Sequence, residues 1–214
     1  VEYNDQRVLI DCGMFQGLKE LRLRNWKQLP IDPSTIDAVI LTHAHLDHCG
    51  HIPALVKNGF NGKVHCTVPT RDLAELILKD SAKIQEEDAE RANRHGYTKH
   101  KPAKPLYDFM DAEKALTHFA THNYHEWVIL NNDMKFQLKN SGHILGSSLI
   151  EFRINNKTFV FSGDLGRTNP LILHPAEYVK TADVVIMEST YGDRLHDPEN
   201  PKEIIHRIIW ETFN

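Results

Sequence analysis

The chain has 214 residues, a length that supports one sizeable hydrophobic core and part of a second domain. Apolar residues make up 41% and charged residues 25%, as in ordinary globular proteins, and no run of about 18 apolar residues could cross a membrane. The net charge of −4 argues against nucleic-acid binding through bulk charge, so any such contact must use local patches. Three cysteines without CxxC spacing favour buried free thiols and a cytoplasmic protein.

The first part of the chain is expected to alternate short strands with helices. Apolar runs and turn residues mark these elements. In chain order they are strands at 1–3 and 7–10, a strand at 36–41 buried on both faces, a helix at 50–58 and a strand at 63–68. Strand, polar turn and helix in succession is the arrangement at which open α/β sheets bind their ligands.

A long helix is predicted next, capped by Thr70 and running to about Arg94. Its apolar face is expected to carry Leu73, Leu76, Ile77 and Ile84. The basic segment 91–105 follows, with five Lys or Arg residues and no acid. We interpret this segment as a surface loop that is either a solvated charge run or a contact for a phosphate backbone.

The second half is expected to be richer in hairpins. In chain order, the predicted elements are a helix from Asp111 to His118, hairpins at 127–138 and 149–161, a buried strand at 183–187 and a helix that starts at Asn200-Pro201. One face of that last helix carries four isoleucines, at 204, 205, 208 and 209.

A histidine cluster dominates the sequence. His43, His45, Asp47 and His48 lie within six positions, directly after the apolar run 38–41. Neutral imidazole and carboxylate are the ligands that zinc and similar divalent metals take. The spacing therefore predicts a metal-binding, hydrolytic site at the end of a buried strand.

Three further polar residues recur in the same setting. His143, Asp164 and Glu188 each follow an apolar strand and sit among small residues. A lone histidine or aspartate of this kind would more often be a loop or turn residue, but their joint recurrence after the histidine cluster favours a shared ligand set. Asp11, at another strand end, fits a site residue and a simple turn residue equally well.

These residues and their order carry a resemblance to a known family. The pattern His43-x-His45-x-Asp47-His48 followed by His143 and Asp164 resembles the metallo-β-lactamase superfamily. The segments 11–13, 141–147, 162–167 and 188–192 are similar to the β-CASP branch, which holds the endonuclease of mRNA 3′-end cleavage and RNase J. The implied fold is α/β, in the four-layer αβ/βα sandwich.

The resemblance also implies a role for each residue. His43, His45 and His143 would bind a first metal ion, Asp47 and His48 would bind a second, and Asp164 would bridge both. Asp47 and Asp164 would thereby take part in catalysis. Asp11 would hold a ligand histidine in its tautomer from behind. Glu188 would support the leaving-group side of the site.

The function implied is metal-dependent hydrolysis of RNA phosphodiester bonds. Two divalent ions, zinc being the first choice, would generate hydroxide from a shared water at neutral pH. Two alternatives stay open: a small-molecule metallohydrolase of the same superfamily, acting on thioesters or lactams, and a catalytically inactive RNA-binding relative. A homo-oligomer is compatible with the sequence.

The family pattern predicts that this chain is an N-terminal fragment. Residues 1–199 are expected to be the N-terminal part of the metallo-β-lactamase domain without its first strand, and 200–214 the start of a β-CASP domain. The family's downstream histidines, one a ligand of the second metal and one a candidate general acid, would lie outside the chain. We therefore expect the second metal position to be incomplete and the chain alone to have weak or no nuclease activity.

Overall fold

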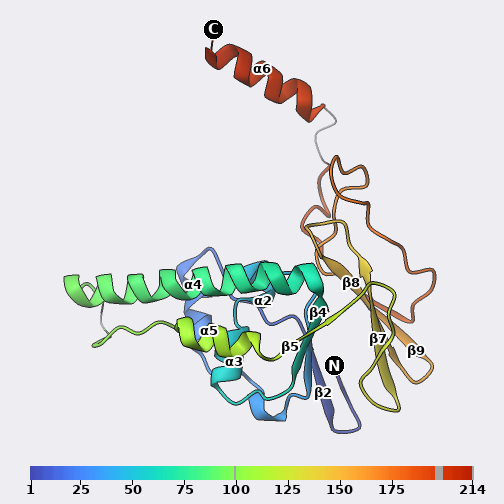
Figure 1. The fold of residues 1–214 in the computed structure, drawn as a ribbon, viewed down its shortest axis with the longest axis horizontal. Helices are drawn as coiled ribbons and strands as arrows, with labels where there is room; N and C mark the ends of the chain where they lie inside the picture. Colours follow the sequence, from blue (N-terminus) through green and yellow to red (C-terminus); the bar gives the residue numbers. More distant parts are fainter. Residues whose placement is uncertain (99, 196–199, 214) are drawn as a thin grey trace.

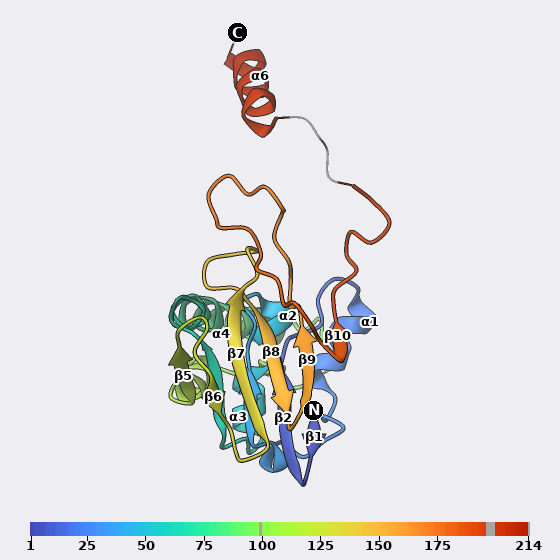
Figure 2. The same cartoon turned by 90° about the vertical axis from the view of Figure 1, so that its right-hand side faces the viewer.

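The computed structural model describes residues 1–98, 100–195 and 200–213. Two five-stranded sheets form its body (Figures 1 and 2). The first sheet has the order β1 (Glu2–Tyr3), β2 (Gln6–Ile10), β3 (Ala38–Ile40), β4 (Lys63–Thr67), β5 (Phe119–His122). The second has the order β10 (Val184–Ile186), β9 (Lys157–Phe161), β8 (Ser148–Ile154), β7 (Met134–Asn140), β6 (Val128–Ile129).

Helices and short turns connect these strands. They are α1 (Lys19–Arg22), η1 (Leu23–Trp26), η2 (Pro33–Thr35), α2 (Leu46–Cys49), α3 (Ile52–Lys57), α4 (Val68–His95), α5 (Phe109–Leu116) and α6 (Pro201–Phe213). No helix among the residues described is long and apolar enough to span a membrane.

The core lies in two layers, one on each face of the first sheet. Val39, Leu41 and Val64 pack towards α3, α4 and α5, which cover the outer face of that sheet (Figure 1). Val8 and Ile40 pack instead against the second sheet. The α/β prediction is confirmed, and the residues described form a helix layer and two sheet layers.

Parallel pairing places the ends of the key strands at one edge. Strands β2, β3, β4 and β5 pair in parallel, and so do β9 and β10. Because β7 and β9 each pair antiparallel with β8, their carboxyl ends share an edge as well. The carboxyl ends of these strands are therefore followed by loops that can approach one another at this edge. These are the loops after β2, β3, β7, β9 and β10.

Several predicted elements differ from the structure in their details. The cap of α4 is Thr67, whose hydroxyl oxygen accepts the Thr70 backbone N–H, so the prediction that Thr70 caps this helix is wrong. Asp108 caps α5 in place of Asp111, which acts as the third residue of a capping box. Strand β5 and the short helix α2 were not predicted, because neither has a periodic apolar pattern of its own.

The buried faces also differ. On α4 the fully buried side chains include Ala74, Leu78 and Ala82, whereas Leu76 and Ile84 are 67% and 51% exposed. Leu78 is part of this contact together with the two alanines, which carry a weaker hydrophobic signal than the exposed Leu76 and Ile84. The predicted Leu73 and Ile77 are partly buried and pack against the same core. The predicted burial of 183–187 is wrong as well, since Val184–Ile186 form an exposed edge strand.

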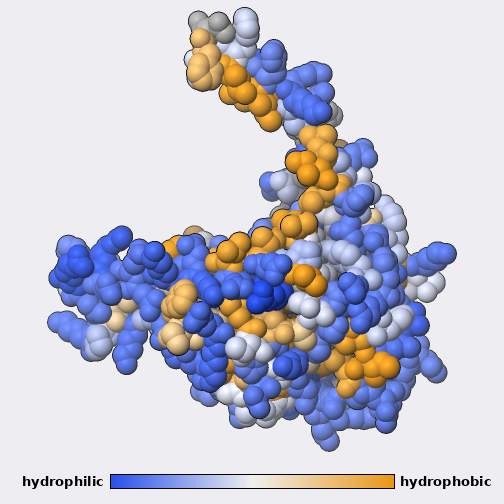
Figure 3. All heavy atoms as spheres, in the orientation of Figure 1, coloured by the Kyte–Doolittle hydropathy of each residue, from blue (hydrophilic) through white to orange (hydrophobic). Residues whose placement is uncertain are grey.

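The last described helix stands apart from both sheets in Figures 1 and 2. Ile205, Ile208, Ile209 and Trp210 are exposed on it, and Figure 3 shows this apolar flank in orange. The helix prediction for this segment is confirmed. The domain boundary at 199/200 stays a prediction.

The basic segment 91–105 is part helix and part loop. α4 ends at His95, and Gly96 in the left-handed conformation closes it. The rest of the segment is mainly exposed, as expected for a surface loop, and Lys99 lies outside the described residues.

Candidate metal centre

Four side chains from two sheets converge on one point. They are His43 and His45 after β3, His143 after β7 and Asp164 after β9, and their ligand atoms all lie within 4.8 Å of one another. His43 is fully buried, and the other three are half-buried. Sequence motifs 120 residues apart therefore meet at the strand ends, as predicted.

The distances fit a tetrahedral metal ion. His45 Nδ1 lies 3.0 Å from His43 Nε2 and 3.1 Å from His143 Nε2. Asp164 Oδ2 lies 3.7 Å from His43 Nε2 and 3.4 Å from His143 Nε2. Ligands about 2.05 Å from a tetrahedral centre would be about 3.3 Å apart. The donor set is thus of the right chemistry and spacing for a divalent metal.

The other carboxylate oxygen of Asp164 faces a second group. His48 Nε2 lies 3.2 Å from Asp164 Oδ1 and 3.7 Å from Asp47 Oδ2. Asp47 and His48 do not belong to the tight group of four, and Asp47 is the more exposed of the two. Asp164 thus lies between the two groups, with one oxygen towards each.

Asp11 lies behind the histidine cluster and forms hydrogen bonds with His48 and Thr42. Its Oδ2 is 2.7 Å from His48 Nδ1, so Nδ1 carries a proton towards Asp11 and Nε2 is the nitrogen directed at Asp164. Asp11 also accepts the backbone N–H and the hydroxyl of Thr42, at 2.7 and 2.8 Å. Asp11 therefore contacts His48 on the side away from the cluster, and its supporting role stays a prediction.

Thr42 was not singled out by the sequence reasoning. Its hydroxyl donates to Asp11 and lies 3.0 Å from His43 Nδ1, which can donate to the hydroxyl oxygen in return. This arrangement leaves His43 Nε2 unprotonated and directed at the cluster. The sequence signal that could have identified Thr42 is a hydroxyl residue directly before the first ligand histidine.

Electrostatics keep the most buried histidine neutral. Burial, with the neighbouring histidines, lowers the pKa of His43 to about 2. Burial also lowers the pKa of His143, although Asp164 opposes this effect. For His48, burial lowers the pKa, but hydrogen bonding to Asp11 and the nearby carboxylates outweigh it and raise the pKa overall. Neutral His43 and His143 are in the form that binds metals.

The loop of His143 is tied to the start of α4. The hydroxyls of Thr67 and Thr70 both donate to the Gly146 carbonyl, at 2.7 and 2.8 Å. Gly146 has a φ of +80°, and a Cβ there would lie 2.6 Å from the Thr70 nitrogen. Only glycine fits where the His143 loop crosses the start of α4. The two hydrogen bonds at this crossing fix the position of the loop that carries His143.

Glu188 holds the Asp164 loop instead of facing the four ligands directly. Its carboxylate accepts the backbone N–H of Leu165 at 2.6 Å, and its own N–H donates to Ser162 Oγ at 3.1 Å. Glu188 also lines a cleft of about 1330 Å³, together with His143, Asp164 and Arg167. Its predicted catalytic role stays a prediction, and its observed contacts position Asp164.

A family model described as "Metallo-beta-lactamase superfamily" matches residues 1–207. The chain belongs to the metallo-beta-lactamase superfamily. This confirms the family predicted from the histidine motif and its partners. Membership in the superfamily, with the His/Asp cluster, also supports binding of a divalent metal ion.

Curated relatives of this superfamily member share about a third of its residues. Ribonuclease TTHA0252 of Thermus thermophilus is 38% identical over 98% of this chain and 44% of its own length. The transcription termination factor FttA and an RNase J-like protein, both of Methanocaldococcus jannaschii, are 33% and 32% identical over 99% of this chain. The chain spans 32% and 43% of those two relatives, so it covers less than half of the length of each of these three relatives.

Proposed function

We propose that this metallo-beta-lactamase superfamily member is a metal-dependent phosphodiester hydrolase that acts on RNA, of the β-CASP type. The observation that carries the proposal is the position of Asp164, with one carboxylate oxygen towards His43 and His143 and the other towards His48. Relatives named as a ribonuclease and as an RNase J-like protein support RNA as the substrate class.

Two divalent ions, zinc by preference, are proposed as the cofactors. When bound, such a pair supplies a hydroxide at neutral pH and offsets negative charge on a phosphate. His43, His45, His143 and Asp164 would hold one ion, and Asp47, His48 and Asp164 the other. Among the described residues, the second set offers these three protein ligands.

The protein's own residues determine where the chemistry occurs. Asp11 and Thr42 orient His48 and His43, so that both rings direct their Nε2 atoms towards the centre. Glu188 fixes the backbone beside Asp164 and thereby the direction of the bridging carboxylate. We propose the cleft beside His143 and Arg167 as the entrance for the substrate backbone, where the guanidinium would pair with a phosphate.

The test measures cleavage of end-labelled RNA by the full-length protein. His43→Ala is the variant, and His100→Ala, which changes an exposed histidine, is the matched control. We expect RNA cleavage by the wild type and the control, and a loss of more than about a hundredfold in His43→Ala, because even residues behind metal ligands cost 10–100-fold. Hydrolysis of a thioester or lactam without RNA cleavage would point to a small-molecule hydrolase instead. Equal RNA cleavage by His43→Ala would contradict the proposal.

A further inference from the structure

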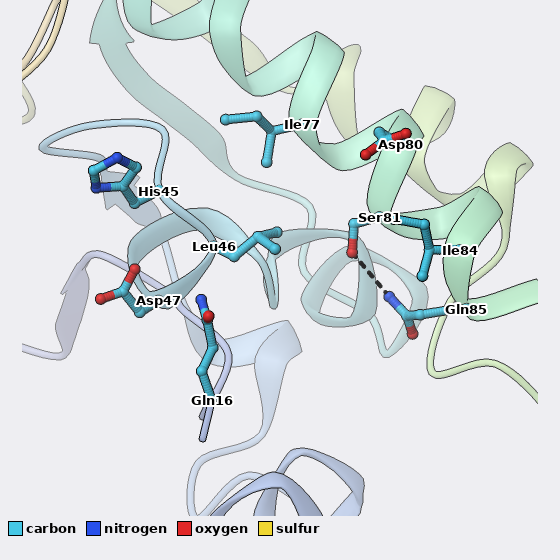
Figure 4. Close-up of a pocket in the computed structure, with 9 residues that line it drawn as sticks. All are labelled: Gln16, His45, Leu46, Asp47, Ile77, Asp80, Ser81, Ile84 and Gln85. Carbon is cyan, nitrogen blue, oxygen red and sulfur yellow. Dashed lines mark hydrogen bonds between the residues drawn. The ribbon is translucent and has the colours of Figure 1, made fainter. Parts of the chain in front are cut away.

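A second groove lies on the other side of the metal centre, between α4 and the segment that begins α2. Its volume is about 520 Å³, within the range of small-ligand sites. The lining residues are Gln16, His45, Leu46, Asp47, Ile77, Asp80, Ser81, Ile84 and Gln85, all drawn in Figure 4. Two of them, His45 and Asp47, also belong to the cluster described above. The groove is therefore continuous with the place where a scissile bond would lie.

The groove's lining does not suit a phosphate. It contains no lysine or arginine, and it carries the carboxylates of Asp47 and Asp80, which would repel an anion. The side chains of Leu46, Ile77 and Ile84 give it apolar walls. Such a lining suits a flat ligand with apolar faces and with hydrogen-bond donors along one edge. A nucleobase has this form.

The far wall of the groove is held in place by its own hydrogen bonds. Gln85 accepts the backbone N–H of Leu106 at 3.1 Å and donates to Ser81 Oγ at 3.2 Å, the bond drawn in Figure 4. Tyr107 donates its hydroxyl to the same Ser81 oxygen at 2.9 Å. These bonds hold the far wall in shape, although the hydroxyl hydrogen of Ser81 and one amide hydrogen of Gln85 are not used in them.

Asp80 differs from these residues. Its side chain is exposed on α4, and no hydrogen bond or ion pair to any of the described residues engages its carboxylate. A carboxylate offers two acceptor oxygens side by side and no donor. Guanine presents two donors side by side, N1–H and N2–H, on its Watson–Crick edge. The other three RNA bases place an acceptor next to their donor, which a carboxylate would repel.

We propose that this groove binds a guanine base next to the scissile phosphate, with Asp80 as the specificity-determining residue. The inference rests on the proposed RNA hydrolysis and goes further, because it names the base and the side chain that selects it. The base would lie against Leu46, Ile77 and Ile84, with its Watson–Crick edge at Asp80. Its neighbouring phosphate would then reach the metal centre past His45 and Asp47.

The first test uses a randomised oligoribonucleotide pool and sequences the product ends. Wild-type intact protein should enrich guanine at one fixed position relative to the cut. Asp80→Asn should reduce that enrichment about tenfold, because one bidentate contact discriminates by this order. The matched control Asp88→Asn, also exposed on α4 but outside the groove, should keep the wild-type preference. Unchanged guanine enrichment in Asp80→Asn, or none in the wild type, would overturn the inference.

A second test requires no hydrolysis and so separates the two proposals. An oligoribonucleotide with 6-thioguanosine is cross-linked to the protein by light, and the modified peptides are mapped by mass spectrometry. Adducts on the peptides of Leu46, Ile77 or Ile84 support the groove, and adducts only elsewhere overturn it. Groove adducts in a protein that cleaves no RNA would refute the proposed hydrolysis and leave base binding in place.

Discussion

At the scale of single residues, the sequence named the cluster and Asp11 behind it, but not the supporting Thr42. His43, His45, His143 and Asp164 could be predicted, because metal ligands have distinctive types and spacing. Thr42 could not, since a single hydroxyl gains its role only from the distances to Asp11 and His43. Contacts of this kind depend on the fold and leave no spacing pattern in the sequence.

Asp11→Asn tests the support behind His48. The variant keeps the shape and tolerates the φ of +61° at this position, but it loses the charged acceptor for His48 Nδ1. We expect metal affinity to fall by about 10–100-fold, measured by competition with a chromophoric chelator. Asp5→Asn, at another positive φ in the first turn, should leave the affinity unchanged. Equal affinity in Asp11→Asn and wild type would show that Asp11 does not support a ligand.

At the scale of elements, strands with regular alternation and the helix α4 were predicted well, whereas the buried face of α4 was predicted only in part. The hairpins formed by β6 to β9 follow turn residues and alternating side chains, and both are present. On α4 the prediction was right for Leu73 and Ile77, which pack against the core. It was wrong for the exposed Leu76 and Ile84, because alanines with a weak hydrophobic signal form part of the close contact. Strand β10 is apolar yet exposed, so apolar character alone did not predict its burial.

Gly146→Ala tests the crossing between the His143 loop and α4. A Cβ would lie 2.6 Å from the Thr70 nitrogen, and the φ of +80° adds strain. Gly96→Ala is the matched control: its φ is +64°, but nothing lies within 4 Å of the added Cβ. We expect the control to lose about 1 kcal/mol of unfolding free energy and Gly146→Ala to lose more. Metal affinity should fall only in Gly146→Ala, and a loss of equal size in both variants would contradict the role of the crossing.

The pair formed by His65 on β4 and His122 on β5 predicts a pH dependence of stability. The rings stack, with His65 Nδ1 2.9 Å from His122 Nε2, and burial lowers the pKa of His65 from 6.5 to about 4. The unfolded chain therefore takes up a proton below pH 6.5 that the folded chain does not. Stability should fall as the pH drops from 6.5 to 4.

His65→Gln isolates this contribution. The wild type should lose roughly 2 kcal/mol more unfolding free energy than His65→Gln between pH 6.5 and pH 4, measured by urea titration at each pH. His100→Gln, which changes an exposed histidine, should follow the wild-type curve. Parallel curves for the wild type and His65→Gln would rule out a buried neutral His65.

At the scale of the whole molecule, the site exists because two sheets bring their strand ends together. His43 and His45 come from the first sheet, and His143 and Asp164 from the second. The sequence predicted this meeting from the polar residues that follow apolar strands and from the family resemblance, whereas composition and periodicity indicated only an α/β protein. The same arrangement leaves two hollows beside the cluster, one along Arg167 and one along α4.

The most direct test of the account is anomalous X-ray scattering from crystals of the zinc-loaded protein, recorded on both sides of the zinc absorption edge. We predict two peaks: one between His43, His45, His143 and Asp164, and one between Asp47, His48 and Asp164. Each should lie about 2.0–2.2 Å from its nearest ligand atoms. Absence of a peak at the first position, or a second peak that does not touch Asp164, would contradict the proposed two-metal centre.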